Sequence, residues 1–269
     1  MITASIGSHR FESGPSFHFN GSCVAELSDI IIDPTSTVEY VNALSGVNTT
    51  PEEMRDVAAS GIARLGIENP KMSHVQTAGN TLVDVTGGGT IDKKQYADSW
   101  SGRLDNRHDI FHGYGLSSQV LDSASVLATR MNNVEETADI IKETAPTDSG
   151  YFVIALAHGG LISAARTFNQ LGEGDHKFGM IRYSRYKRRD SVPSLIPYPH
   201  EREAWFRRQA EGRQVVVVDE DYSSGETLKT ATRYFAGLLA TKVMGIAPVE
   251  VDRRIEYKPL VINLNSLKN

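Results

Sequence analysis

The sequence contains a single cysteine, Cys23, so no disulfide can form within the chain. A lone cysteine is typical of a protein from a reducing compartment. Free cysteines are most often small buried side chains, and we interpret Cys23 in this way rather than as a catalytic thiol. No stretch reaches the roughly 18 apolar residues of a membrane span, and the N-terminus lacks a basic segment followed by an apolar run. We therefore expect a soluble, cytoplasmic protein with no membrane partner.

An excess of charge of one sign is also missing. The 269 residues include 28 lysines and arginines and 33 acidic residues, which gives a net charge of -5. This balance argues against bulk binding to nucleic acid, so we expect no nucleic-acid partner, although it leaves local basic patches open. With 40% hydrophobic and 23% charged residues, the composition is that of an ordinary globular protein.

Strand-like and helix-like patterns alternate from about residue 116 onward. This alternation is typical of a parallel sheet with crossover helices, and continuous apolar runs indicate strands that are covered on both faces. The segments predicted as strands are 151–157, 178–183, 214–218 and 243–251. The segments predicted as helices are 116–131, 134–141, 161–171 and 228–238. We predict an α/β core over residues 116–269, with an open parallel sheet and helices on both faces.

The first 115 residues give weaker signals. Thr50 begins a helix, because Pro51 follows in the first turn and Glu53 stands three residues after the Thr cap. The helical pattern continues to Gly66. The segment 86–115 is rich in Gly, Asp and Asn, and we predict a long loop region there.

The segment VVVVDEDYSSGETL, residues 215–228, runs from four valines into three acids and a turn of small residues. Carboxylates at the end of a buried strand are costly unless they bind something. Ligands of parallel sheets lie beyond the carboxyl ends of the strands, where backbone N–H groups at a helix N-terminus bind phosphate. Asp219 and Glu220 would accept hydrogen bonds from a sugar. The residues predicted to bind the phosphate are Ser223, Ser224, Gly225, Glu226 and Thr227.

These residues resemble the signature by which type I phosphoribosyltransferases bind phosphoribosyl pyrophosphate (PRPP), with Glu220 where aspartate is commoner. AHGGLISAA, residues 157–165, resembles the family's pyrophosphate loop, with His158 where arginine or lysine is frequent. IRYSRYKRR, residues 181–189, resembles the mobile loop that closes over the reaction centre. A merely solvated basic face is the competing interpretation of this last segment.

The resemblance covers about residues 116–250 and implies a five-stranded parallel core. It implies transfer of the 5-phosphoribosyl group of PRPP to a small, nitrogenous acceptor with release of pyrophosphate. Mg²⁺ would bind at Asp219 and Glu220, which would also hold the ribose hydroxyls. The resemblance also suggests a homodimer, with residues 1–115 as a hood that recognises the acceptor and 256–267 pairing with that hood as a strand. The residues implied in catalysis are Asp219, Glu220, Arg182 and Lys187, and the further substrate-binding residues are His158, Gly159, Gly160, Ser184 and Tyr186.

The identity of the acceptor is less defined. Relatives that use 6-oxopurines carry an acid at the position of Ser223, and the closing loop of orotate enzymes has no clear match. We therefore expect an unusual acceptor. The alternative function is a non-catalytic regulatory protein that binds PRPP or a nucleotide in the same fold, which His158 and Glu220 favour slightly.

Three further features have ordinary interpretations. His108 and His112 have the spacing of two metal ligands on a helix, but the two nearby glycines make a zinc site the less favoured interpretation. TGGGT, residues 86–90, lacks the ending of a P-loop, and we predict a loop or hairpin. The aromatic residues that could stack on an acceptor, or serve in packing, are Tyr96, Trp100 and Tyr114.

Overall fold

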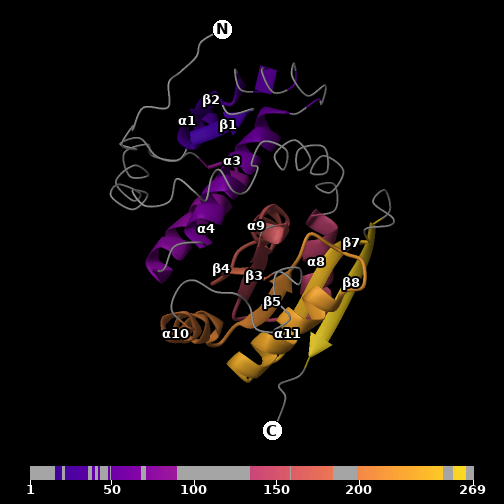
Figure 1. The fold of residues 1–269 in the computed structure, drawn as a ribbon. Helices are drawn as coiled ribbons and strands as arrows, with labels where there is room; N and C mark the ends of the chain where they lie inside the picture. The colour runs from indigo at the N-terminus through magenta and orange to yellow at the C-terminus, as the bar shows by residue number, and fades with distance from the viewer. Residues whose placement is uncertain are drawn as a thin grey trace.

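The computed structural model describes residues 16–19, 22–35, 38–39, 42, 48, 50–67, 71–89, 134–157, 159–183, 199–250 and 257–264. Its helices are α1 (Leu27–Ile32), α3 (Pro51–Ile67), α4 (Met72–Thr86), α8 (Val134–Thr144), α9 (Gly160–Gln170), α10 (Pro199–Ala210) and α11 (Glu226–Leu239). Its strands are β1 (Ser16–Phe19), β2 (Ser22–Glu26), β3 (Tyr151–Ala157), β4 (Lys177–Arg182), β5 (Gln214–Val218), β6 (Asp221–Tyr222), β7 (Val243–Glu250) and β8 (Tyr257–Leu264). The fold is α/β, with helices, a mixed six-stranded main sheet and a separate antiparallel pair formed by β1 and β2 (Figure 1).

The strands of the main sheet follow the order β4-β3-β5-β7 and are parallel to one another. Val249 of β7 pairs with Asp221 of β6 on one side and with Tyr257 of β8 on the other. The short strand β6 therefore continues the path of β5 along β7, and β8 occupies the other edge of β7. β3 and β5 are buried along their apolar residues, as the continuous apolar runs at 151–157 and 215–218 predicted.

The prediction for the C-terminal segment was wrong. We expected 256–267 to pair with the N-terminal extension, but β8 pairs antiparallel with β7 in the main sheet. The sheet is therefore mixed rather than wholly parallel. Leu260, Val261 and Ile262 are only partly buried and pack against the core. Backbone pairing at the edge of a sheet needs no particular sequence, so the strand pattern alone could not identify its partner.

Helices cover both faces of the sheet. Phe178 of β4 contacts Phe168 of α9, and an added Cβ on Gly79 of α4 would touch Met180 and Phe178. An added Cβ on Gly179, the next residue of β4, would instead meet Trp205 of α10. Because neighbouring residues of a strand point to opposite faces, α4 and α9 lie on one face and α10 on the other. Figure 1 agrees, with α10 and α11 together on the side of the sheet away from α9.

The capping box predicted for the helix at Thr50 is confirmed. The backbone N–H of Glu53 donates to Thr50 Oγ1 at 3.2 Å, and the backbone N–H of Thr50 donates to Glu53 Oε2 at 2.6 Å. Every residue of α3 from Asp56 to Ala63 is buried. Close approach to α4 is possible because Gly66 has no side chain, since its Cβ would lie 2.2 Å from that of Ala78. The helix is therefore enclosed by its neighbours rather than laid on a surface.

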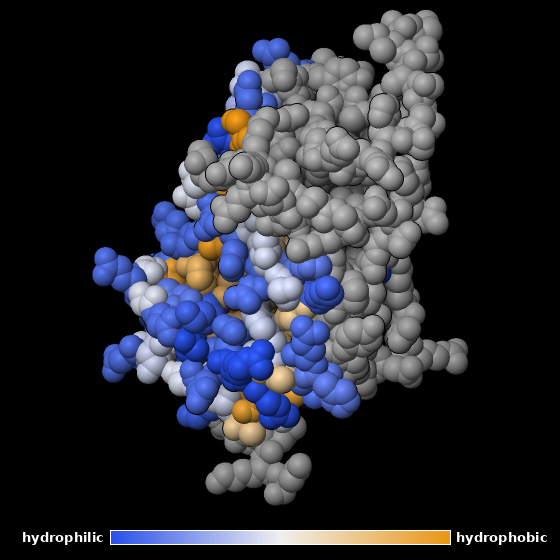
Figure 2. Space-filling model, turned by 90° about the vertical axis from the view of Figure 1, so that its left-hand side faces the viewer, coloured by the Kyte–Doolittle hydropathy of each residue, from blue (hydrophilic) through white to orange (hydrophobic). Residues whose placement is uncertain are grey.

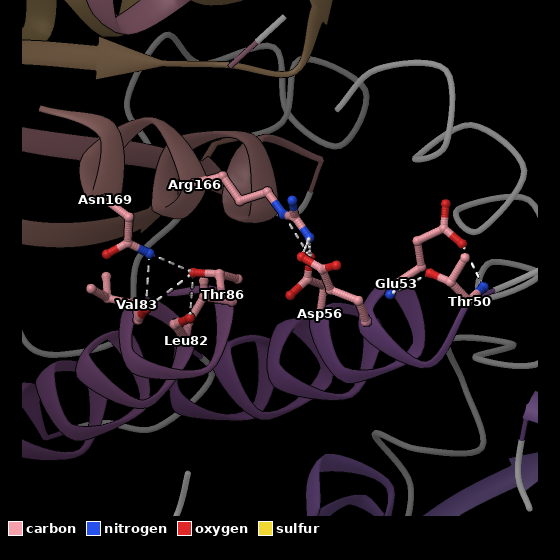
Figure 3. Close-up of polar contacts among 9 residues, drawn as sticks. Thr50, Glu53, Asp56, Leu82, Val83, Thr86, Arg166 and Asn169 are labelled. Carbon is pink, nitrogen blue, oxygen red and sulfur yellow. Dashed lines mark hydrogen bonds and ion pairs between the residues drawn. The ribbon is translucent and has the colours of Figure 1, made fainter. Parts of the chain in front are cut away.

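Polar contacts link α9 to the two N-terminal helices (Figure 3). Arg166 donates from Nε to Asp56 Oδ2 of α3 at 2.7 Å, and its Nη2 lies 3.2 Å from Glu52 Oε1. One turn further on, Asn169 donates to the backbone oxygen of Val83 at 3.0 Å and to Thr86 Oγ1 at 3.1 Å. One cluster of buried apolar side chains runs from Ile30 to Ala247, so the described part of the N-terminal region shares its core with the sheet.

The described residues on the left-hand face of Figure 1, where α4 and α10 lie, are largely hydrophilic, with small separate apolar spots (Figure 2). Among the residues that the structure describes, Ile32 is the exposed large hydrophobic side chain. No described helix combines the length and the apolar character needed to cross a membrane.

Several predictions fall outside the described residues. They are the helix at 116–131, the histidine pair His108 and His112, and the aromatic residues Tyr96, Trp100 and Tyr114. In the TGGGT segment, Gly87 and Gly88 form the turn that ends α4, and Gly88 has a positive φ of 84°. The helices α4 and α10 had not been predicted.

Candidate functional site

The site lies where the order of the strands reverses. β3 is followed along the chain by β4 on one side, and the next strand, β5, pairs with the other side of β3. In sheets of this kind a crevice forms at the carboxyl ends of the two strands from which the connections depart in opposite directions. Here these strands are β3 and β5. Gly159 and Gly160 follow β3, and Asp219 and Glu220 follow β5, so the topology brings two of the predicted motifs together.

The two motifs are in direct contact. A Cβ added to Gly159 would lie 2.1 Å from Glu220 Oε1, so the Glu220 carboxylate lies against the Gly159 backbone. A Cβ added to Gly160 would lie 2.9 Å from the backbone oxygen of Val218 and 3.0 Å from Asp219 Cα. Steric contact therefore explains why glycine is required at both positions, because any side chain there would occupy the space of the acid pair or of the end of β5.

Asp219 and Glu220 are both half-buried at the end of β5. The Asp219 N–H donates to the backbone oxygen of Ile246 at 3.1 Å, which ties the start of the turn to β7. Asp219 Oδ1 accepts the Glu220 N–H at 3.0 Å. These contacts fix the backbone of the acid pair while both carboxylates remain partly accessible.

The phosphate-binding turn predicted at 223–227 begins α11. Ser223 and Ser224 are exposed, and Ser224 Oγ accepts the Glu226 N–H at 3.5 Å. Gly225 is the N-cap, with a positive φ of 72°, a conformation that L-residues with side chains rarely adopt. The first helical hydrogen bond runs from the Lys229 N–H to the Gly225 oxygen at 2.9 Å. The turn, which is exposed at Ser223, Ser224 and Glu226, therefore stands at the positive end of a 14-residue helix.

Two residues of the turn have neighbours that the sequence did not reveal. A Cβ on Gly225 would lie 2.5 Å from a methyl carbon of Leu260, so β8 covers the buried side of the turn. The Glu226 carboxylate pairs with Lys229 Nζ at 3.0 Å. The Glu226 backbone N–H could therefore donate a hydrogen bond to an anion, while Lys229 balances the charge of the Glu226 carboxylate.

The remaining predicted residues divide into two groups. Arg182 ends β4 and pairs in register with Ala157, the last residue of β3, which brings Arg182 to the same edge of the sheet. His158, Ser184, Tyr186 and Lys187 lie outside the described residues. The sequence thus located the sheet edge, the acid pair and the turn that begins α11, while the phosphate-binding role of this turn and the closing loop stay predictions.

One charged residue near the acid pair had not been predicted. The Arg64 guanidinium, in the last turn of α3, has its pKa lowered by burial, and the negative charge of Glu220 opposes that effect. Figure 1 shows how α3 comes to be there. β8 is antiparallel to β7 and runs toward the C-terminus, so the parallel strands point toward β1, β2, α1 and α3. No sequence signal identifies this arginine, because its position depends on how α3 packs.

The carboxylates also bear on metal binding. Mg²⁺ is commonly held by one or two carboxylates together with phosphate oxygens of a substrate. Asp219 and Glu220 fit this pattern, and the described residues contain no cluster of three or more His, Cys, Asp or Glu suited to a dedicated metal site. The donor set therefore suits an ion that arrives with a phosphorylated ligand.

No protein-family model matches the chain, and no curated protein or solved structure does so either.

Proposed function

We propose that this protein is a phosphoribosyltransferase of the type I class, which transfers the 5-phosphoribosyl group of PRPP to a small nitrogenous acceptor. The observation that carries the proposal is the contact between the Gly159-Gly160 segment and the Asp219-Glu220 pair at the switch point of the sheet. An exposed turn at the N-terminus of α11 follows the same strand. These are the three parts that a phosphorylated sugar carrying a second anionic group requires.

Each part has a distinct task in this reaction. The N–H groups of the turn from Ser223 to Thr227 bind the 5-phosphate, because the turn is exposed at Ser223, Ser224 and Glu226 and stands at the positive end of a helix. Asp219 and Glu220 accept hydrogen bonds from the ribose hydroxyls, and their negative field stabilises positive charge that develops on the sugar as its C1–O bond breaks. The backbone after β3 receives the pyrophosphate, with Arg182 and Lys187 supplying positive charge to the leaving group.

Mg²⁺ bound at the acid pair would neutralise part of the negative charge on the leaving pyrophosphate. The remaining work is positioning. The acceptor must reach C1 from the face opposite pyrophosphate, while the rigid ends of β3 and β5 hold the sugar. The hood assigned to residues 1–115 is supported by the position of α3 on the side toward which the parallel strands point (Figure 1).

The test is release of pyrophosphate from PRPP in the presence of Mg²⁺ and a panel of nitrogenous acceptors. We expect one acceptor class to support turnover. Asp219→Asn combined with Glu220→Gln should lower kcat/KM by about 100-fold or more, because charge stabilisation in the transition state is lost. Asp221→Asn, in the neighbouring strand β6, is the matched control and should retain turnover near that of the wild type.

Saturable binding of PRPP without turnover on any acceptor would instead support the regulatory alternative. Glu220 favours that alternative to a limited degree, because its carboxylate already lies against Gly159 and near the charge of Arg64. Absence of both binding and turnover would refute the proposed function in either form.

A further inference from the structure

Leu260 of the C-terminal strand β8 lies against the turn that begins α11. A Cβ added to Gly225, the N-cap of this helix, would lie 2.5 Å from Leu260 Cδ2 and 3.9 Å from Leu260 Cγ. The methyl group of Leu260 therefore occupies the place that a side chain of Gly225 would take. Leu260 is partly buried and packs against the core, so the sheet sets its position.

The register of the sheet explains why Leu260 reaches this turn. Ile262 pairs with Gly245 of β7, and a Cβ added to Gly245 would clash with Thr232 Oγ1 of α11. Residues that lie opposite each other in a sheet point to the same face, and every second residue of a strand shares that face. Leu260, Ile262 and Leu264 therefore all face α11.

The same stretch of β7 also holds the acid pair. Leu260 pairs with Ala247, and the preceding residue of β7, Ile246, accepts the Asp219 N–H at 3.1 Å. Adjacent residues of one strand thus anchor the backbone of the acid pair directly and the turn at 223–227 through Leu260. The pairing of β8 with β7 therefore fixes the turn relative to the acids.

Gly225 needs a contact of this kind because it has no side chain to restrict its own backbone. Its φ of 72° is one of several conformations open to glycine. The Lys229 N–H binds the Gly225 oxygen on the helix side of this residue, whereas Leu260 contacts the residue from the sheet. A turn that is already held in its binding conformation binds a phosphate more tightly, because less conformational freedom is lost on binding.

We propose that Leu260 is a positioning residue, which holds Gly225 in the conformation that lets the turn at 223–227 bind the 5-phosphate of the sugar. This inference rests on the proposed function, which it extends by giving the C-terminal strand a role in substrate affinity. Leu260 acts through Gly225 and touches no reacting atom. Its loss therefore weakens binding of a phosphorylated sugar and leaves the chemical step unchanged once PRPP is bound.

Leu260→Ala removes the contact with Gly225, and Leu264→Ala is the matched control. Leu264 is also a partly buried leucine on the face toward α11, but it lies four residues, or about 13 Å, further along β8. Calorimetric titration with ribose 5-phosphate should give about tenfold weaker binding for Leu260→Ala, which corresponds to a turn that is competent to bind about one tenth of the time. Leu264→Ala should bind ribose 5-phosphate as the wild type does.

Steady-state kinetics distinguish positioning from a general loss of structure. Leu260→Ala should raise the KM for PRPP by about tenfold and leave kcat within about twofold of the wild type, because the turn binds the 5-phosphate equally in the ground state and the transition state. Leu260→Met keeps an apolar side chain of similar volume and should restore KM to near the wild-type value.

A further variant keeps the test decisive if Leu260→Ala does not fold. Leu260→Val suits a strand but lacks the methyl group that reaches Gly225, so it should also weaken binding of ribose 5-phosphate. Circular dichroism and thermal melting establish which variants are folded.

The outcomes separate this inference from the proposed function. Wild-type affinity for ribose 5-phosphate in the folded Leu260 variant, or an equal loss of affinity in Leu264→Ala, would overturn the role of Leu260 while leaving PRPP turnover intact. Binding of ribose 5-phosphate that depends on Leu260, without turnover of PRPP on any acceptor, would retain this inference and refute the transferase reaction. Failure of the wild type to bind either ribose 5-phosphate or PRPP would refute both.

Discussion

The buried carboxylate of Asp56 gives the sharpest quantitative prediction for the link between α3 and α9. Its side chain is only 1% exposed and pairs with Arg166, whose Nη2 lies 2.5 Å from Asp56 Oδ2. An arginine this close would lower the pKa of an exposed aspartate. Burial outweighs that effect here and raises the pKa of Asp56 from 3.8 to about 6, and the negative charges of Glu52 and Glu53 add to the increase.

The magnitude follows from the difference in pKa between the folded and the unfolded protein. At 1.36 kcal/mol for each unit of pKa, the change from 3.8 to about 6 corresponds to about 3 kcal/mol. The folded protein binds a proton on Asp56 more tightly than the unfolded chain does. The contribution of Asp56 to the free energy of unfolding therefore increases as the pH falls through 6 toward 3.8, by about 2 kcal/mol between pH 7.5 and 4.5.

The perturbation that isolates this contribution is Asp56→Asn, which keeps the size of the side chain and an acceptor oxygen for Arg166 but cannot titrate. Urea unfolding followed by circular dichroism gives the free energy of unfolding of both proteins between pH 7.5 and 4.5. We expect the wild type to gain about 2 kcal/mol relative to the variant over this range. The comparison uses the difference in free energy of unfolding between the wild type and Asp56→Asn, so pH-dependent contributions that are the same in both proteins cancel.

Asp175→Asn is the matched control, because an exposed aspartate with close cations should behave in the opposite way. Hydrogen bonds from Lys177 and Arg213 lower the pKa of Asp175. The wild type should therefore lose stability relative to Asp175→Asn as the pH falls toward and below 3.8. Parallel pH profiles of the wild type and Asp56→Asn would refute the reasoning for Asp56. A loss of wild-type stability relative to Asp56→Asn in acid would show that the ion pair outweighs burial.

The other two predictions concern the site and the core. Gly159→Ala would put a Cβ 2.1 Å from Glu220 Oε1, so the Glu220 carboxylate must move. We expect ribose 5-phosphate binding to weaken by about tenfold. The free energy of unfolding of the protein should change by less than about 1 kcal/mol. Gly237→Ala is the control, because nothing lies within 4 Å of the Cβ added to this exposed helical residue. It should stabilise the protein by about 0.5 to 1 kcal/mol and leave ribose 5-phosphate binding unchanged. Weaker binding in both variants would contradict this account. Burial lowers the pKa of His176 below its usual 6.5, so its NMR titration should occur below that pH and its contribution to stability should fall as the pH drops through this range; a midpoint at or above 6.5 would contradict that.

Local patterns in the sequence were sufficient for much of the core. Four consecutive valines at 215–218 and the apolar run at 151–157 predicted buried strands, because only a strand covered on both faces accommodates such runs. The cap at Thr50 predicted the start of α3, since its hydrogen bonds join residues three apart. The turn after β5 was also predictable, because the small and polar residues that form it are adjacent in the sequence.

Other elements were decided by contacts between segments far apart in the chain. The segment 256–267 was expected to form a strand, yet the pairing of β8 with β7 depends on which edge of the main sheet lies open in the folded protein. The helices α4 and α10 had gone unpredicted, although each packs on β4 in the structure, as the contacts of Gly179 and Gly79 show.

By itself, the sequence determined which residues form β3, β4, β5 and β7, and it located the acid pair and the turn at the start of α11, because each depends on neighbours along the chain. Only the tertiary structure decided that the two glycines after β3 touch the acids after β5, and that Glu220 opposes the lowering of the pKa of Arg64, which stands 156 positions earlier in the chain. The physical reason is that Coulomb and steric interactions act over distance in space, and the fold sets those distances independently of separation in sequence.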